Sequence, residues 1–317
     1  MPHLQLTSAT GQVPVAVADE PAEPRQWFED NRLAVADLLA GHGAVVVRGL
    51  VWADTATFGQ LAETAFGPLM VEREGFAKRD DFGSGVYSGT EWTPDFPMCM
   101  HHELSYTAAP PRYLMFGCVQ PPAKGGVTGL SDSRVILEQL PPTMVSEFTA
   151  RGWQLTRNYN SETGVTWAEA FGLSSRAEVE AYCDRHGIAW QWRSGGGLRT
   201  TQRLTAIVEH PADGSARWFN QIAFLNKWTL DPLIRDFLIF EYGEDGLPFD
   251  TSFGDGTPIS ADIVETINAV YEANTLREPW QRGDLLLVDN VAMAHSREVF
   301  EGDRQIVVAM ATPATLR

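Results

Sequence analysis

Hydrophobic residues recur along the chain with two spacings, one typical of helices and one typical of buried strands. Near-helical spacing covers residues 24–39, and Gly41 follows as a stop signal. Short, almost wholly apolar runs predict buried strands at residues 43–50, 113–119, 284–289 and 305–310. Further helices are expected at about residues 54–66, 133–140, 142–150, 175–186, 231–242 and 261–274. Many short strands with helices inserted between them predict a mainly β protein, an antiparallel double-sheet jelly roll.

Two other segments differ in how clearly their sequences predict a structure. Residues 204–209 and 216–220 flank a turn with Asp213-Gly214 at its tip, which is typical of a β-hairpin. Residues 70–98 contain many charges and four glycines but little periodicity. Long irregular segments of this kind are usually functional or disordered. Because this one leads directly into residue 101, we expect a loop at the mouth of a pocket; a charged surface loop is the alternative.

The composition narrows the class of protein. The 317 residues are 44% hydrophobic and show no repeat or linker, so we predict a single domain over residues 1–317. A net charge of −17 argues against a nucleic-acid partner. No apolar run reaches membrane-spanning length, and no signal-peptide pattern is present, so we expect no membrane partner. Cys99, Cys118 and Cys183 lack metal or redox spacing, which favours free thiols in a reducing, cytoplasmic setting.

The first candidate for chemistry lies in residues 97–106. His101 and Glu103 are two residues apart, which would place both side chains on one face of an extended strand. His102 would then point to the opposite face. An imidazole and a carboxylate are two of the three ligands in the 2-His-1-carboxylate triad that holds non-haem Fe(II). With 7 His and 41 acidic residues in the chain, about one such pair is expected by chance, so a second histidine is needed.

The remaining groups are expected far downstream. His295 follows a predicted strand, whose end could project it beside His101 and Glu103. These three ligands would leave three positions on Fe(II), two for a bidentate 2-oxo acid and one for dioxygen. The distal carboxylate of the oxo acid needs a cationic fork, and Arg304 is placed to supply it, with the Thr128 hydroxyl as a further donor. Taken alone, His295 could be an ordinary exposed histidine, and Arg304 could be an ordinary surface arginine.

Several short motifs follow one another in a single order between about residues 43 and 312. They are Phe-Gly-Pro68, Val-Tyr-Ser-Gly-Thr-Glu91, His101-His-Glu-Leu-Ser-Tyr106, Gly-Gly-Val-Thr128, Trp-Phe-Asn-Gln221, Gly-Asp-Leu-Leu-Leu-Val-Asp-Asn290 and Phe-x-Gly-x-Arg304. Together with His295 they resemble the taurine dioxygenase (TauD/TfdA) superfamily of Fe(II)/2-oxoglutarate-dependent dioxygenases. Within it, they are most similar to the branch that contains the syringomycin-type aspartyl hydroxylases of peptide natural-product pathways.

The resemblance implies the double-stranded β-helix fold, a cupin-like version of the jelly roll. It implies metal ligands at His101, Glu103 and His295, and 2-oxoglutarate contacts at Thr128 and Arg304. Fe(II) would be the cofactor, with 2-oxoglutarate and O2 as co-substrates. The implied reaction is hydroxylation of an unactivated C–H bond, with desaturation or cyclisation as alternatives. Related halogenases have Ala or Gly in place of the carboxylate, so Glu103 argues against halogenation.

The substrate implied by the resemblance is an amino acid or natural-product intermediate, either free or tethered to a carrier protein. Carrier domains tend to be acidic and would be repelled by a chain of net charge −17, which favours a free small molecule. Candidate substrate contacts are Asn220, Gln221 and Arg297, the last for a carboxylate; all three could instead hold strands together. A non-catalytic metal- or small-molecule-binding jelly roll is the main alternative function, and a homo-oligomer remains open.

Overall fold

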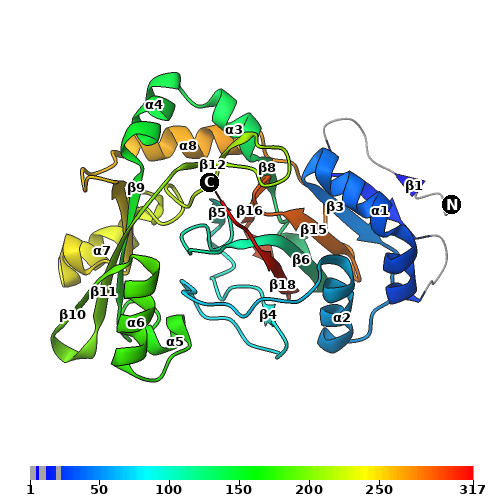
Figure 1. Ribbon diagram of the computed structural model, residues 1–317, viewed down its shortest axis with the longest axis horizontal. Helices are drawn as coiled ribbons and strands as arrows, with labels where there is room; N and C mark the ends of the chain where they lie inside the picture. Colours follow the sequence, from blue (N-terminus) through cyan, green and yellow to red (C-terminus); the bar gives the residue numbers. More distant parts are fainter. Residues whose placement is uncertain (1–4, 7–11, 19–22, 317) are drawn as a thin grey trace.

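The computed structural model describes residues 5–6, 12–18 and 23–316, and its largest element is a seven-stranded sheet (Figure 1). In spatial order its strands are β1 (Gln5–Leu6), β2 (Val15–Val17), β3 (Ala44–Arg48), β15 (Leu285–Asp289), β6 (Pro111–Gln120), β18 (Gln305–Pro313) and β4 (Val86–Ser88). Neighbouring strands are antiparallel except β2 and β3, which are parallel. The strongly apolar runs of the sequence form the centre of this sheet.

A smaller sheet contributes two of the site residues. It consists of β5 (Met98–His101), β16 (Met293–Arg297) and β8 (Leu130–Asp132), with β16 in the middle. Beside it, β7 (Lys124–Gly125) pairs with β17 (Phe300–Glu301). Met98 and Met100 of the small sheet belong to the same hydrophobic core as Leu114 and Phe116 of the large sheet. The two mainly antiparallel sheets packed across one core confirm the predicted jelly roll.

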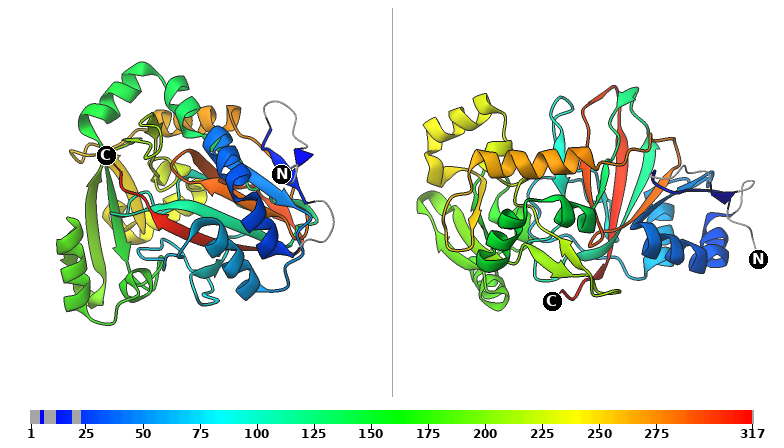
Figure 2. Two further views of the ribbon diagram at one scale, coloured as in Figure 1. Left: turned by 45° about the vertical axis from the view of Figure 1, so that its right-hand side comes forward. Right: turned by 90° about the horizontal axis from the view of Figure 1, so that it is seen from above.

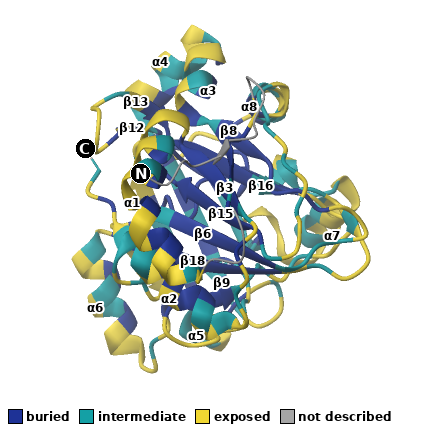
Figure 3. Cartoon of the chain, turned by 90° about the vertical axis from the view of Figure 1, so that its right-hand side faces the viewer, coloured by how far each residue is buried: buried dark blue, intermediate teal, exposed yellow. Residues whose placement is uncertain are grey.

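The alternation of side chains along the central strands explains why their sequences are apolar throughout. Leu286 and Val288 of β15 belong to the core shared with the small sheet, whereas Leu285 and Leu287 belong to a second core on the opposite face. Helices α1 (Pro24–His42) and α2 (Thr55–Phe66) cover that second face (Figures 1 and 3). A strand buried on both faces needs apolar residues at every position.

A second group of elements lies beside the jelly roll (Figure 2). Its sheet has the order β10 (Ala189–Trp192), β11 (Leu198–Leu204), β9 (Trp153–Tyr159) and β14 (Phe249–Phe253). The remaining hairpin pairs β12 (Ile207–Glu209) with β13 (Ala216–Trp218), which confirms the turn expected at Asp213-Gly214. The other helices are α3 (Ser133–Gln139), α4 (Pro142–Arg151), α5 (Trp167–Phe171), α6 (Arg176–His186), α7 (Pro232–Tyr242) and α8 (Ala261–Ala273), with short 3-10 turns at Ser194–Gly196, Lys227–Thr229 and Glu244–Gly246. Among the described residues, no helix is long and apolar enough to cross a membrane.

Candidate active site

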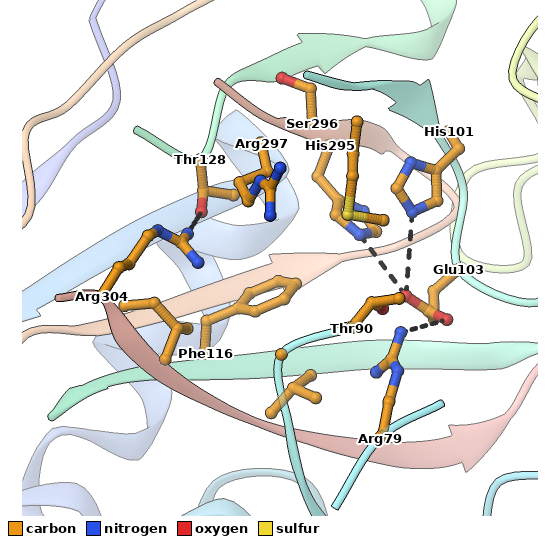
Figure 4. Close-up of a pocket in the computed structure, with 14 residues that line it drawn as sticks. Arg79, Thr90, His101, Glu103, Phe116, Thr128, His295, Ser296, Arg297 and Arg304 are labelled. Carbon is orange, nitrogen blue, oxygen red and sulfur yellow. Dashed lines mark hydrogen bonds and ion pairs between the residues drawn. The ribbon is translucent and has the colours of Figure 1, made fainter. Parts of the chain in front are cut away.

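The two histidines expected to bind a metal lie opposite each other on neighbouring strands. His295 of β16 is the register partner of His101 at the end of β5, and their ring centroids are 4.3 Å apart. The Oε2 atom of Glu103 lies 4.0 Å from His101 Nε2 and 3.5 Å from His295 Nε2 (Figure 4). All three side chains are buried, and their candidate ligand atoms lie within 4.8 Å of one another. The structure therefore brings the three predicted ligands together.

Glu103 reaches this position from a turn. Strand β5 ends at His101, so the expectation that His101 and Glu103 share one extended strand was wrong, although their side chains do meet. The next residue, Leu104, has a φ of 50°, a left-handed value that non-glycine residues rarely adopt. The Asn290 side chain holds the turn, because its Oδ1 accepts from the Glu103 N–H at 2.8 Å and its Nδ2 donates to the Glu103 carbonyl at 3.0 Å.

The protonation states suit binding of a divalent cation. His101 Nδ1 lies 2.8 Å from the Cys99 carbonyl, which can only accept, so the proton is on Nδ1 and the Nε2 lone pair faces Glu103. Burial, and then the neighbouring His295, lower the pKa of His101 to about 3, so its imidazole is neutral at pH 7. Burial alone would raise the pKa of Glu103, but Arg79 and the two histidines outweigh it and hold this pKa below its usual value.

The donor set of two imidazoles and one carboxylate fits Fe(II). This facial arrangement is typical of non-haem iron oxygenases, because it leaves one side of the metal free for co-substrates. His102, in contrast, faces away from the group: its ring nitrogens lie 2.6 Å and 2.9 Å from the carbonyl oxygens of Asn290 and Trp218. The expectation that His102 points to the opposite face is confirmed.

The predicted co-substrate residues also lie together. Arg304 donates from Nε to the Gly126 carbonyl at 2.9 Å and from Nη2 to the Thr128 hydroxyl at 3.4 Å. Burial, and then the nearby Arg297, lower the pKa of Arg304 to about 10. In the part of the chain that the structure describes, no carboxylate forms an ion pair with the Arg304 guanidinium. A desolvated cation without a counter-ion is suited to bind an anion such as the distal carboxylate of a 2-oxo acid.

The glycine pair before Thr128 allows Arg304 to approach. Gly125 and Gly126 have φ values of 68° and 67°, in the left-handed region that glycine adopts without cost. A Cβ atom on Gly126 would lie 2.9 Å from Phe300 Cβ and 3.1 Å from Arg304 Cδ. Gly126 therefore makes room for the Arg304 side chain as well as forming part of a turn.

A pocket of about 470 Å³ joins the metal-ligand group to Arg304. Its walls include apolar side chains from both sheets: Met98, Phe116, Ile306 and Val308. Arg79, Gly89 and Thr90 also line it, which confirms that the irregular segment 70–98 forms part of the pocket (Figure 4). The alternative of a purely solvated surface loop does not hold for these three residues.

Comparisons with known proteins agree with this geometry. The family model described as "Taurine catabolism dioxygenase TauD, TfdA family" matches residues 6–310. The chain belongs to this family. The dapdiamide synthesis protein DdaC from Enterobacter agglomerans is 31% identical over 312 residues, which cover 98% of this chain and 92% of DdaC. The predicted class of Fe(II)/2-oxoglutarate-dependent dioxygenase is thus confirmed.

Solved structures show the same fold. A taurine dioxygenase from Burkholderia xenovorans superposes with a TM-score of 0.60 at 14% identity, covering 99% of this chain and 91% of that one. PvcB from Pseudomonas aeruginosa, described as an Fe, alpha-ketoglutarate dependent oxygenase from an isonitrile synthetic pathway, has a TM-score of 0.54 at 14% identity, covering 97% of this chain and 91% of its own. These likenesses confirm the predicted double-stranded β-helix.

The three candidate substrate residues occupy different places. Asn220 donates to the Ala206 carbonyl at 3.0 Å and Gln221 to the His102 carbonyl at 2.7 Å, and neither lines the pocket. Arg297 does line it, but its Nη atoms donate to the carbonyls of residues 92, 93 and 96 at 2.6–2.8 Å. The structure thus brings Arg297 to the site, where it tethers the segment 92–96, and leaves Asn220 and Gln221 outside the pocket.

Two residues that support the site were not found from the sequence. Arg79 contacts Glu103 from the irregular loop, and Asn290 holds the backbone of Glu103 from the end of β15. Asn290 had a partial signal, because it is one of two polar residues that follow the apolar run 285–288. Arg79 is one of many charges in its segment, and nothing local distinguishes it from them.

Proposed function

We propose that this enzyme hydroxylates an unactivated C–H bond of a small, amino-acid-like molecule on a natural-product pathway. The observation that supports it most directly is one pocket that contains the His101–Glu103–His295 group and, across from it, the guanidinium of Arg304. The name of DdaC refers to dapdiamide synthesis and the description of PvcB to an isonitrile synthetic pathway. Both relatives support a role in making a small natural product.

The residues of the chain have separate tasks in this reaction. His101, Glu103 and His295 would hold Fe(II), which when bound supplies the activation of O2 coupled to conversion of 2-oxoglutarate to succinate and CO2. Arg304 and Thr128 would orient the distal carboxylate of 2-oxoglutarate by charge-assisted hydrogen bonds. The apolar walls of the pocket exclude water and hold the target C–H bond close to the reacting centre.

The substrate that we favour is free rather than carrier-bound. The net charge of −17 would oppose an acidic carrier domain. Asn220 and Gln221 then act on the substrate only indirectly, by holding the backbone carbonyls of Ala206 and His102, respectively. We further propose that residues 1–317 work as one oxygenase domain, in the cytoplasm, where the free thiols Cys99, Cys118 and Cys183 would stay reduced. A homo-oligomer is compatible with this proposal.

Metal content and succinate formation test the proposal together. The purified protein, loaded anaerobically, is expected to bind about one Fe(II) per chain and to release succinate when a panel of amino acids and natural-product precursors is supplied with 2-oxoglutarate and O2. His101→Ala and His295→Ala should lose both properties, whereas His42→Ala, at the end of α1, should keep them. A protein that binds Fe(II) but never forms succinate would instead fit the non-catalytic jelly roll. Full activity in either ligand variant, with the fold intact, would refute the triad.

A further inference from the structure

Arg79 lies between two carboxylates beside the metal-ligand group. Its side chain is 5% exposed, and its Nη2 lies 3.0 Å from Glu103 Oε1 (Figure 4). Its Nε lies 3.6 Å from the Oε1 atom of Glu72. The residue belongs to the irregular loop, whereas Glu103 follows strand β5, so the contact joins the loop directly to a metal ligand.

The two oxygen atoms of Glu103 therefore have different partners. Oε1 accepts from Arg79, and Oε2 faces the Nε2 atoms of His101 and His295. A carboxylate can bind a metal through one oxygen or through both. A hydrogen bond from a charged donor holds one oxygen in place and leaves only the other for the metal. A glutamate side chain has more rotational freedom than an aspartate, which makes such a restraint more necessary.

We propose that Arg79 is a positioning residue that keeps Glu103 monodentate, and so keeps one coordination position free for O2. The inference rests on the proposed function. Two histidines, one carboxylate oxygen and a bidentate 2-oxo acid would occupy five of the six positions that Fe(II) can offer. A bidentate Glu103 would occupy the sixth. The contact between Arg79 and Oε1 prevents this while leaving the triad itself unchanged.

Arg79 could also act only by anchoring the loop, and the test must distinguish this structural role from the positioning of Glu103. Its guanidinium forms ion pairs with Glu72 and Glu103, and it helps to anchor the loop. Arg73 offers a matched control from the same loop. Its Nη1 donates to the Phe171 carbonyl at 2.7 Å, and it does not line the pocket. Arg73→Met removes the same charge and one loop anchor without touching Glu103.

Binding of nitric oxide, which takes the position of O2 on Fe(II), reports the free coordination site without turnover. The full-length protein is loaded anaerobically with Fe(II) and 2-oxoglutarate, and nitric oxide is titrated while the electron paramagnetic resonance signal of its iron complex is recorded. Arg79→Met is expected to weaken nitric oxide binding about tenfold or more, in the range seen when an outer partner of a metal ligand is removed. Arg73→Met should match the wild type. Arg79→Lys, which keeps a charged donor, should recover most of the affinity.

Several outcomes would overturn the role of Arg79. Wild-type affinity in Arg79→Met would show that Glu103 needs no such restraint, and equal losses in Arg73→Met and Arg79→Met would show that only the loop matters. Equal losses of nitric oxide affinity in Arg79→Lys and Arg79→Met would show that a charged donor at this position does not restrain Glu103. If Arg79→Met does not fold, E72Q/R79M removes the opposing buried charge as well and carries the same comparison. Failure of the wild type to bind Fe(II) would refute the proposed function instead.

Discussion

Arg79 and Arg304 both line the pocket, but the groups around each arginine suit it to a different role. Arg79 is paired with Glu103, so its charge is already compensated inside the protein. Arg304, among the described residues, donates to neutral oxygen atoms of Gly126 and Thr128. Because a desolvated cation gains most from an anion when no counter-ion is present, Arg304 is suited to bind the co-substrate and Arg79 to orient a ligand of the metal.

The first prediction concerns Arg304. In Arg304→Ala, 2-oxoglutarate should bind the metal-loaded protein about 2–5 kcal/mol more weakly, roughly 30- to several-thousand-fold, because a partly buried charge-assisted contact is lost. Isothermal titration of 2-oxoglutarate into the Mn(II)-loaded protein measures the change. Arg134→Ala, an exposed arginine on α3, is the control. An unchanged affinity in Arg304→Ala would place the carboxylate elsewhere, with Arg297 as the next residue to test.

A second prediction concerns the stability of the metal-free protein in acid. The pKa of His101 is lowered from 6.5 to about 3 in the folded protein, so protons bind more tightly to the unfolded chain. The stability that this residue contributes is complete when the pH is above the pKa of His101 in the unfolded chain. It is lost as the pH falls from 6.5 towards 3. Between pH 6 and 4 the wild type should lose about 1.4 kcal/mol per pH unit more than His101→Gln, which cannot titrate. Urea unfolding at several pH values tests it; identical slopes would contradict the prediction.

At the scale of elements, the irregular loop is held at one point by many contacts. Glu74 has a φ of 60°, and its carbonyl accepts from Arg157 at 2.6 Å and from Tyr106 at 2.7 Å. Its carboxylate accepts from Tyr182 at 2.7 Å, and its N–H donates to Ala170. These contacts anchor the loop to the second group of elements. They place Arg79, five residues further on, beside the metal-ligand group, so an unusual backbone conformation is held by contacts with other elements.

The turn that contains Gly126 yields the third prediction. Gly126→Ala should weaken 2-oxoglutarate binding, because the new Cβ would contact Phe300 and displace Arg304. Gly187→Ala is a matched control, since Gly187 has a similar φ of 68°, but a Cβ added there would meet no atom of the described residues within 4 Å. Both variants should lose roughly 1–2 kcal/mol of stability from the left-handed backbone, but only Gly126→Ala should lose affinity for 2-oxoglutarate. Equal affinities in the two variants would refute the packing role of Gly126.

At the scale of the whole molecule, the site joins parts that are far apart in the sequence. The large sheet supplies Phe116 and Val308, the small sheet supplies the two histidines, and the loop supplies Arg79. Unfolding of any of these parts would destroy the site. A ligand that binds only the assembled site must therefore stabilise the entire jelly roll.

The fourth prediction follows from this linkage. Mn(II) with 2-oxoglutarate, each at about 100 times its dissociation constant, should raise the free energy of unfolding by about 2.7 kcal/mol for each ligand whose binding requires the folded site. Urea unfolding with and without the ligands measures it. A His101→Ala/His295→Ala double variant should show no such gain. The same gain in that variant would mean that Mn(II) binds elsewhere.

The sequence by itself determined the local elements and the residue types of the site. Periodicity identified the central strands and most helices because it follows from which face of each element is buried. The motifs predicted metal ligands at His101, Glu103 and His295 and co-substrate contacts at Thr128 and Arg304, because the chemistry of the metal and of the oxo acid requires those side chains.

The tertiary structure alone decided how the ligands are held. Asn290 holds Glu103 across 187 residues of sequence, and Arg79 holds it across 24. Nothing in the local pattern indicates such pairings, because they depend on sheet register and on the path of a loop without periodicity. The same limit explains why Glu103 lies in a turn after β5, and why the two Nη atoms of Arg297 tether residues 92–96. Contacts between distant segments arise only when the sheets pack, and these contacts orient the catalytic groups.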